Sequence, residues 1–379
     1  MNRKISAIKR IEEMAGKLDG VISLAQGIPS FPSHEIIRRE VIKAVERNLV
    51  DKYSPVAGLP ELRSLVSERI LKRGMRYSWE KEIIITAGAI EALSASIFAL
   101  LKEGEEIIVF TPTYSYYSRI GKIRGLKIVS VPLDEENGWD ISIESFNNSI
   151  NEKTRGVVIC NPNNPTGSVM GRDRLMQIAE IAERNNMLIF LDDVYEDLYY
   201  EEGELFNLCS LERFKERIIR IVSFSKSLAL SGWRIGFLHG PERLIEEILY
   251  VHDVLVNCAP VISQYAAITG LRNEAIISSY HKDYLKRRAI MEIYLIDLKE
   301  YLSFVRPIGS YYFFPRMKGV DNTEDFCIDM LKKTRVAMVP GSDFGQGGEG
   351  HIRICFGRSE DDIHEGMKRF GEYLKQKNA

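Results

Sequence analysis

Short apolar runs alternate with longer amphipathic stretches through the middle of the chain. Seven runs rich in β-branched residues predict strands at Ile83–Thr86, Glu106–Thr111, Leu126–Val131, Gly156–Cys160, Leu188–Asp192, Ile218–Phe224 and Ile235–His239. Their nearly continuous hydrophobicity is typical of strands that are covered on both faces. The helices predicted between them are Ala89–Leu101, Tyr114–Arg124, Arg172–Asn185 and Arg243–Val256. This alternation predicts an α/β fold with a mostly parallel seven-stranded sheet covered by helices.

The pattern changes after about residue 275. A long charged helix, an apolar run, a short helix, a strand and an amphipathic helix are predicted there, at Tyr280–Leu302, Gly309–Pro315, Glu324–Lys333, Ile352–Phe356 and Glu360–Lys375. These pieces predict a smaller α+β domain formed by residues 1–44 and 279–379, beside a larger domain formed by residues 45–278.

Composition narrows the classes of function. The 51 basic and 53 acidic residues nearly cancel, so no surface suited to nucleic acid or to a membrane is indicated. Five scattered cysteines without a C-x-x-C pair argue against disulfides and zinc, and the six histidines show no metal-ligand spacing. No apolar stretch reaches the roughly 18–20 residues of a membrane span, and the first twenty residues lack a signal-peptide core. We therefore expect a cytoplasmic protein without a metal.

Ligands of α/β proteins bind just beyond the carboxyl ends of the strands, and four segments with suitable chemistry fall there. The first, Thr86–Glu91 (T-A-G-A-I-E), ends a strand and opens a helix. Its small residues leave the first N–H groups of the helix free to face an anion, although a plain turn has the same pattern. The second, Asn161–Gly167 (N-P-N-N-P-T-G), is an irregular loop that is more constrained than a turn requires.

The third and fourth segments carry ionisable side chains. Asp192 and Tyr195 (D-D-V-Y) follow an apolar strand, where both can reach one planar ring, or where an acid can cap the next helix. Ser223–Lys226 (S-F-S-K) places a lysine at the end of a buried strand. Burial lowers the pKa of an amine and frees its lone pair for Schiff-base chemistry. Arg234 follows eight residues later, where it can pair with a phosphate unless it is a surface arginine.

Together, N-P-x-N-P-T-G, D-x-x-Y and S-x-S-K followed by G-W-R-I-G resemble the motifs of the class I (class I/II) aminotransferases, in the same order. These are fold-type I enzymes that depend on pyridoxal 5′-phosphate (PLP). The resemblance covers nearly the whole chain. It implies that Lys226 forms a Schiff base with PLP and moves the substrate's Cα proton, and that Asp192 pairs with the pyridine nitrogen. It also implies that Tyr195 and Asn164 contact the ring's 3′-oxygen, so the catalytic residues would be Lys226, Asp192 and Tyr195.

The resemblance implies further contacts with the cofactor and the substrate. The residues expected to bind PLP are Gly88, Ala89, Ile90, Tyr114, Asn164, Asp192, Tyr195, Ser223, Ser225, Lys226, Arg234 and Tyr53. Tyr114 matches an aromatic residue that stacks on the pyridine ring. Tyr53 matches a tyrosine that binds the neighbouring subunit's phosphate, which implies a homodimer with shared active sites. The residues expected to bind the substrate are Gly27, Asn164 and Arg353, whose guanidinium suits the α-carboxylate.

The substrate's side chain is left open between an aspartate-like and an aromatic group. One aspartate-specific branch of the family has a lysine where this chain has Ile90. Another branch takes an arginine from the partner subunit near the position of His252 and Asp253. Neither device for a distal carboxylate is plainly present. Candidates for an aromatic pocket, where they are not core residues, are Tyr116, Tyr117, Phe31 and Tyr311–Phe314.

The sequence therefore predicts a PLP-dependent aminotransferase that works by a ping-pong cycle. It would move the amino group of an L-amino acid to a 2-oxo acid such as 2-oxoglutarate. A PLP-dependent C–S β-lyase uses the same lysine and ring chemistry, so the motifs do not separate the two. A non-catalytic PLP-binding regulator is a remote alternative, because no segment is apparent that would hold a DNA-binding domain.

Overall fold

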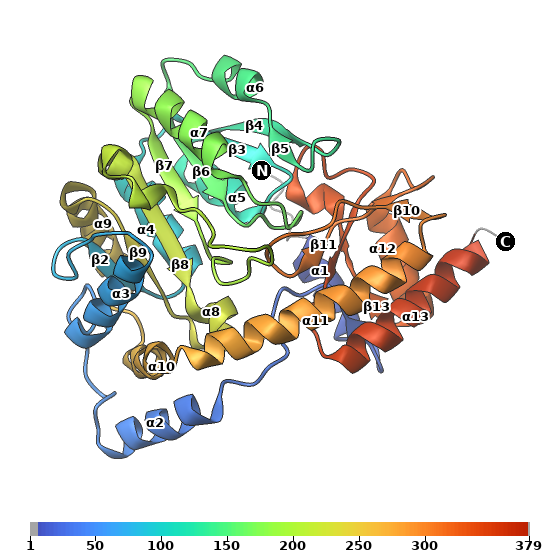
Figure 1. Ribbon diagram of the computed structural model, residues 1–379, viewed down its shortest axis with the longest axis horizontal. Helices are drawn as coiled ribbons and strands as arrows, with labels where there is room; N and C mark the ends of the chain where they lie inside the picture. The colour runs from blue at the N-terminus through green and yellow to red at the C-terminus, as the bar shows by residue number, and fades with distance from the viewer. Residues whose placement is uncertain (1–6, 378–379) are drawn as a thin grey trace.

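The computed structural model describes residues 7–377. Figure 1 shows a twisted sheet with helices on both faces, and beside it a second region in which the blue N-terminal helix lies among the orange and red C-terminal elements. None of the helices in these residues is long and apolar enough to cross a membrane.

The main sheet has eight strands. In spatial order they are β2 (Ile83–Thr86), β9 (Gly236–His239), β8 (Ile218–Ser223), β7 (Leu188–Asp192), β6 (Thr154–Cys160), β3 (Glu106–Thr111), β4 (Lys127–Asp134) and β5 (Asp140–Ile141). Strands β8, β7, β6, β3 and β4 are mutually parallel, whereas β9 and β5 run antiparallel to their neighbours. The predicted α/β fold with a mostly parallel sheet is confirmed. The predicted count of seven strands was one short, because β5 has only two residues and leaves no apolar run in the sequence.

The alternation of side chains along each strand explains the unbroken hydrophobic runs. In β7, Ile189 and Leu191 belong to one buried apolar cluster, and Phe190 between them belongs to another. Successive residues of a strand point to opposite faces, so a sheet covered on both faces needs apolar residues at every position. The helices around this sheet are α3 (Pro60–Lys72), α4 (Ala89–Leu100), α5 (Tyr116–Arg124), α6 (Ile143–Asn148), α7 (Arg172–Arg184), α8 (Phe224–Ser227), α9 (Glu242–Val256) and α10 (Val261–Arg272).

The second region is built from both ends of the chain. Its helices are α1 (Ala7–Ala15), α11 (Ala275–Asp297), α12 (Thr323–Thr334) and α13 (Glu360–Lys377). Its short strands are β1 (Ile22–Ser23), β10 (Leu302–Ser303), β11 (Tyr312–Phe313), β12 (Arg316–Met317), β13 (Val336–Ala337), β14 (Val339–Pro340) and β15 (Ile352–Cys355). Strand β1 pairs with β13, and the Ala7 N–H donates to Asp343 Oδ1 at 2.9 Å. The N-terminal segment is thereby joined to C-terminal elements.

Two helices begin two or more residues away from their predicted starts. Helix α11 begins and ends five residues earlier than the predicted Tyr280–Leu302, since nothing in Ala275–Ser279 breaks a helix. Helix α5 begins at Tyr116 because residues 112–115 form the irregular connection that follows β3. Helix α2 (Glu35–Glu46) packs on α10 at the edge of the molecule. The division into a larger and a smaller domain stays a prediction.

Candidate functional site

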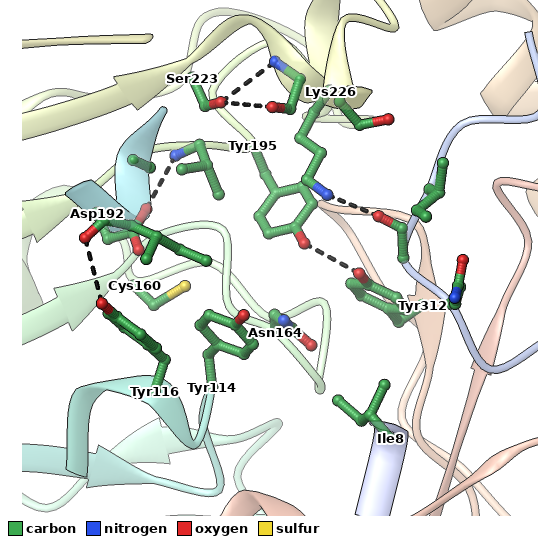
Figure 2. A pocket seen from close by; sticks show the side chains of 18 of the residues that line it. Ile8, Tyr114, Tyr116, Cys160, Asn164, Asp192, Tyr195, Ser223, Lys226 and Tyr312 are labelled. Carbon is green, nitrogen blue, oxygen red and sulfur yellow. Dashed lines mark hydrogen bonds between the residues drawn. The ribbon is translucent and has the colours of Figure 1, made fainter. Parts of the chain in front are cut away.

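A cavity of about 540 Å³ lies at the carboxyl ends of β6, β7 and β8. Twelve of the residues predicted to form the site line it: Gly27, Ala89, Ile90, Tyr114, Asn164, Asp192, Tyr195, Ser223, Ser225, Lys226, Arg234 and Arg353. Figure 2 shows Asp192 and Lys226 entering the cavity from different elements, with Tyr195 between them. Residues that are far apart in the sequence therefore share one enclosed space.

Lys226 enters the cavity from α8, the single helical turn that follows β8. Ser223 caps this turn by accepting a hydrogen bond from the Ser225 N–H at 3.2 Å. The Lys226 Nζ donates to the Gly27 carbonyl at 2.6 Å. Burial, with smaller contributions of the same sign from Arg353 and Arg234, lowers the pKa of Lys226 to about 8. A substantial fraction of this amine is therefore neutral near physiological pH and can act as a nucleophile or a base.

Asp192 ends β7 and is buried. Burial raises the pKa of Asp192 to about 6, and two hydrogen bonds oppose this rise. Its Oδ2 accepts from the Tyr117 hydroxyl at 2.7 Å, and its Oδ1 accepts from the Val194 N–H at 3.3 Å. Asp192 is therefore mostly a carboxylate at pH 7, in a position to hold a cation inside the protein.

One end of the cavity is suited to an anion. Helix α4 begins after Gly88, and no side chain caps its first N–H groups. Ser223 and Ser225 lie nearby, with their hydroxyl groups 2.9 Å apart. Arg234 packs so closely on Gly88, whose φ is +86°, that a Cβ at that position would lie 2.7 Å from the Arg234 Nη2. Only glycine allows this arginine to reach the start of α4.

The loop Asn161–Gly167 uses its three asparagines differently. Asn161 and Asn163 bind the loop and its surroundings, since Asn161 Oδ1 accepts from the Met170 N–H and Asn163 Nδ2 donates to the Pro112 carbonyl. Asn164 alone faces the cavity, where its Oδ1 accepts from Arg353 Nη1 at 2.9 Å. Of the three asparagines, Asn164 is therefore the one that can contact a ligand in the cavity.

Arg353 is buried beside Asn164 at the cavity wall. Its Nη2 donates to the Ala25 carbonyl at 2.5 Å, and its guanidinium lies 4.2 Å from the centre of the Tyr312 ring. The Nε of Arg353 is buried and has no hydrogen-bond partner among the described residues. A buried guanidinium N–H without a partner is costly, so this atom is suited to an anionic ligand.

The segment around Gly27 closes the cavity from the N-terminal side. The Gly27 carbonyl accepts from both Lys226 and the Tyr311 hydroxyl, each at 2.6 Å. A Cβ on Gly27 would lie 1.8 Å from the Tyr312 hydroxyl, which itself shares a 3.0 Å hydrogen bond with Tyr195. Only glycine can approach these tyrosines so closely.

Two predicted residues lie outside the cavity wall. Gly88 stands directly behind it, against Arg234. Tyr53 is 82% exposed and does not line the cavity of its own chain, which is compatible with its expected role in a neighbouring subunit.

The structure also adds residues that the sequence did not assign to catalysis. Tyr117 was considered only for a substrate pocket, yet it is the hydrogen-bond donor to Asp192. Its position in the apolar pattern of α5 carries no signal of this contact. Helix α1 contributes Ile8, Lys9, Glu12 and Glu13 to the wall, and Figure 2 shows Ile8 at the cavity's edge. Among the other aromatic candidates, Phe31 stacks on Tyr280 away from the cavity, and Tyr116 and Tyr312 line it.

A sequence model of the family described as aminotransferase class I and II matches residues 19–370. The chain belongs to the class I and II aminotransferases. This aminotransferase is 34% identical to an aspartate aminotransferase of Pyrococcus abyssi, over 98% of this chain and 96% of the relative. It is 33% identical to aromatic-amino-acid aminotransferase 2 of Thermococcus litoralis, with the same coverage. The solved aromatic aminotransferase of Pyrococcus horikoshii superposes with a TM-score of 0.90 at 32% identity, covering 98% of this chain and 99% of that one.

Enzymes of this family use PLP, and the cavity of this aminotransferase fits that cofactor. Lys226 offers an amine of lowered pKa to an aldehyde. The uncapped start of α4, with Ser223, Ser225 and Arg234, offers donors to a phosphate. Asp192 offers a buried carboxylate to a protonated ring nitrogen.

The hydrogen bond from Tyr117 to Asp192 predicts a change in pH dependence. We expect Tyr117→Phe to raise the pKa of Asp192, because the substitution removes a donor that stabilises the carboxylate. A hydrogen bond to a charged group contributes about 1.5–3 kcal/mol, which corresponds to a shift of roughly 1–2 pH units. The acidic limb of the profile of log(kcat/KM) against pH should move upward by this amount.

Tyr116→Phe is the matched control for this measurement. Tyr116 lines the same cavity, but its hydroxyl bonds to Ser94 at 2.6 Å instead of to Asp192. The acidic limb of the pH profile of the Tyr116→Phe variant should coincide with that of the wild-type protein. Equal shifts in the two variants, or none in Tyr117→Phe, would contradict the role given to Tyr117.

Proposed function

We propose that this aminotransferase transfers the amino group of an aromatic or large apolar L-amino acid to a 2-oxo acid such as 2-oxoglutarate, by a ping-pong cycle. The observation that carries the proposal is the arrangement in one cavity of a lysine with lowered pKa, a buried carboxylate and a buried arginine with a free N–H group. Amine, ring partner and carboxylate anchor are the three groups that the reaction requires.

In this proposal Asp192 would pair with the ring nitrogen of PLP and Lys226 would bind its aldehyde. The start of α4, Ser223, Ser225 and Arg234 would hold its phosphate, and Tyr114 would contact its ring. Asn164 has its Oδ1 occupied by Arg353, which leaves its amide N–H groups to bind the ring's 3′-oxygen together with the hydroxyl of Tyr195. Each contact uses a group that already lies at the cavity wall.

The residues of the chain then have separate tasks. PLP, when bound, supplies a ring that withdraws electrons from the substrate's Cα. Arg353 binds the α-carboxylate and so orients the Cα–H bond toward Lys226. The neutral Nζ of Lys226 would accept the proton from the substrate's Cα. Asp192, as a carboxylate, would favour the protonated form of the ring nitrogen.

The preference for aromatic or apolar donors rests on the outer wall of the cavity. Its side chains are mainly aliphatic or aromatic, namely Ile8, Ile28, Ile90, Leu93, Tyr114 and Tyr116. Of the cations in the wall, Lys226 and Arg234 are already assigned to the cofactor, and Arg353 is assigned to the α-carboxylate. Lys9, the other cation in the wall, has Glu12 and Glu13 beside it on α1. Such a wall favours an apolar side chain over a second carboxylate.

The first prediction from this proposal concerns the capture of PLP. We expect borohydride reduction of the PLP-loaded protein to leave an adduct on Lys226, found by peptide mapping. Only the neutral amine reacts, so the rate of PLP capture by cofactor-free protein should rise about tenfold per pH unit and level off near pH 8, where Lys226 is half neutral. Adducts spread over surface lysines, or a rate that rises to the pKa of an ordinary lysine, would contradict the assignment.

The second prediction concerns the donor. With 2-oxoglutarate as acceptor, kcat/KM should be higher for tyrosine and phenylalanine than for aspartate. Ile90→Lys should reverse part of this preference, because it places a cation in the apolar wall, and one ion pair is worth a factor of roughly ten or more. Ile123→Lys, on the exposed surface of α5, is the control. A wild-type preference for aspartate, or release of pyruvate and ammonia without amino transfer, would refute the proposed donor or reaction.

We also propose a homodimer in which Tyr53 completes the partner's active site. Helix α2 lies at the edge of the molecule in Figure 1. Ile42 and Val45 on this helix, and Leu49 just after it, are 45–56% exposed. Tyr53 follows them with its side chain free in solvent. An apolar helix surface next to an exposed tyrosine is suited to a second copy of the chain.

A cytoplasmic location is proposed as well, since all five cysteines are buried free thiols.

Mixed dimers test the shared site. Tyr53→Phe should weaken PLP binding by roughly ten- to a hundredfold, the value of one hydrogen bond to a charged group. When Tyr53→Phe and Lys226→Ala subunits are combined, half of the sites in the mixed dimers hold both native residues and should regain wild-type affinity for PLP. A monomer in sedimentation, or mixed dimers without recovery, would show that Tyr53 does not act across subunits.

A further inference from the structure

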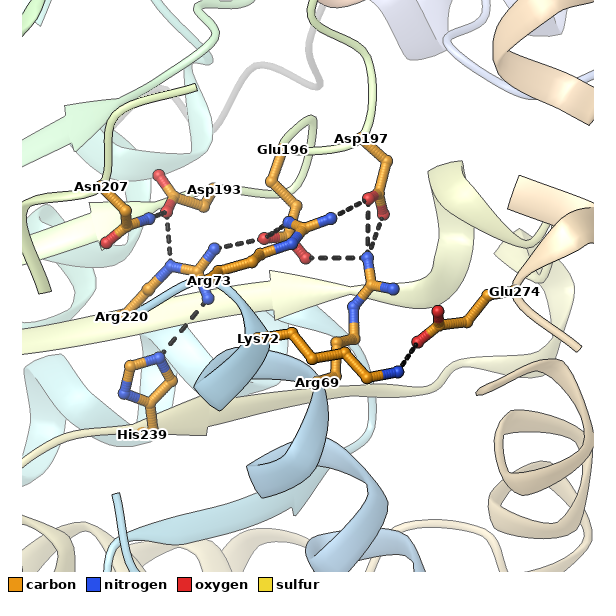
Figure 3. Close-up of polar contacts among 10 residues, drawn as sticks. All are labelled: Arg69, Lys72, Arg73, Asp193, Glu196, Asp197, Asn207, Arg220, His239 and Glu274. Atoms are coloured by element: carbon orange, nitrogen blue, oxygen red, sulfur yellow. Dashed lines mark hydrogen bonds and ion pairs between the residues drawn. The ribbon is translucent and has the colours of Figure 1, made fainter. Parts of the chain in front are cut away.

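A buried ionic cluster lies behind the wall that carries Asp192 and Tyr195. It consists of three guanidinium groups and three carboxylates, from Arg69, Arg73, Arg220, Asp193, Glu196 and Asp197. Figure 3 shows the three acids coming from one loop after β7, and Arg220 coming from β8. Arg69 comes from α3, and Arg73 is the residue that directly follows this helix. The formal charges of the cluster balance.

The cluster is tightly enclosed at its centre. Arg220 is 1% exposed, its Nε donates to Asp193 Oδ2 at 2.5 Å, and its Nη2 donates to Glu196. Glu196 also binds Arg73, and Asp197 accepts from Arg69 at 2.6 Å. Burial opposes the charge on Glu196, but the surrounding arginines outweigh it and lower the pKa of this carboxyl. His239, the further neighbour of Arg220, adds no charge, since burial lowers its pKa well below the usual value.

The loop that carries these acids lies between two cavities. Asp192 and Tyr195 line the 540 Å³ cavity, whereas Glu196 and Asp197 line a second cavity of about 430 Å³ on the other side. Residues 193–198 of this loop are neither helix nor strand. Their main chain donates from Asp193, Glu196 and Leu198 and accepts from Ser310. The ion pairs of Asp193, Glu196 and Asp197 add side-chain contacts to these bonds and tie the loop to α3 and β8.

We propose that the Arg220-centred cluster positions the loop that follows Asp192 and carries Tyr195, and so sets how these two groups meet the cofactor. Arg220 is a positioning residue in this proposal and does not touch the substrate. The inference rests on the proposed function, because the roles of Asp192 and Tyr195 are part of it. Buried charged contacts that are fully paired give a defined geometry, and a displacement of catalytic groups by about 1 Å can lower a rate by about a hundredfold.

The test uses PLP-loaded full-length protein with Arg220→Met and Glu196→Gln. We expect kcat for amino transfer to fall roughly 10- to 100-fold, with little change in KM for the donor, because Arg353 lies outside the cluster. The pH midpoint of the visible absorption of bound PLP should also shift, since it reports the groups around the ring. Glu196→Gln keeps the shape of the side chain, so it carries the test if Arg220→Met does not fold.

Two controls separate positioning from plain loss of stability. Asp140→Asn breaks the ion pair between Asp140 of the edge strand β5 and Arg174 of α7, which lies away from both cavities. Phe146→Leu, in the buried core beside Phe110, lowers thermal stability without touching the cluster. Both should keep the wild-type kcat and absorption midpoint.

The outcomes are distinct. If the cluster variants lose only as much thermal stability as Phe146→Leu, with kcat and the absorption midpoint unchanged, the positioning role is overturned while the proposed function stands. If the wild-type protein itself fails to bind PLP through Lys226, the proposed function falls, and this inference falls with it. A selective loss of kcat with a shifted midpoint supports both.

Discussion

The parallel alignment of β6, β7 and β8 is the constraint on which the rest of the site depends. The register of their hydrogen bonds places Cys160 beside Asp192, and Asp192 beside Ile221. All three strands therefore end at one edge of the sheet, and each continues into a segment with chemical function. Asn164, Asp192 and Lys226 are brought together by the course of the main chain. A shift in this register would separate them.

The second requirement is burial, which acts on opposite charges in opposite directions. The enclosed cavity raises the pKa of Asp192 to about 6 and lowers that of Lys226 to about 8. Both shifts bring the pKa values toward neutral pH, where Lys226 can gain and lose a proton at little cost. Tyr117 limits the shift of Asp192 so that the carboxylate persists. Packing of the same apolar core therefore provides both the fold and the reactivity.

The site is completed by contacts between the two ends of the chain. Ala25 and Gly27 accept hydrogen bonds from Arg353 and Lys226 respectively, so the N-terminal segment lies between the C-terminal region and the main sheet. The Arg220 cluster lies on the other side of the D-D-V-Y segment, away from the cavity. On the cavity side, Asp192 accepts a hydrogen bond from Tyr117, and the hydroxyl group of Tyr195 is bonded to that of Tyr312.

The sequence by itself determined the class of fold, the strand ends and most of the cavity wall. These follow from local signals: unbroken β-branched runs fix buried strands, and glycine, proline, serine and lysine at the strand ends fix the chemistry there. Only the tertiary structure decided that Tyr117 binds Asp192, that α1 closes the cavity, that Asn164 is the one asparagine of its loop that faces it, and that Arg220 pairs with Asp193 and Glu196. The physical reason is that each of these contacts joins residues far apart in the chain, or selects one face of a loop. A pattern of hydrophobicity reports which side chains are buried but not which partner each one meets.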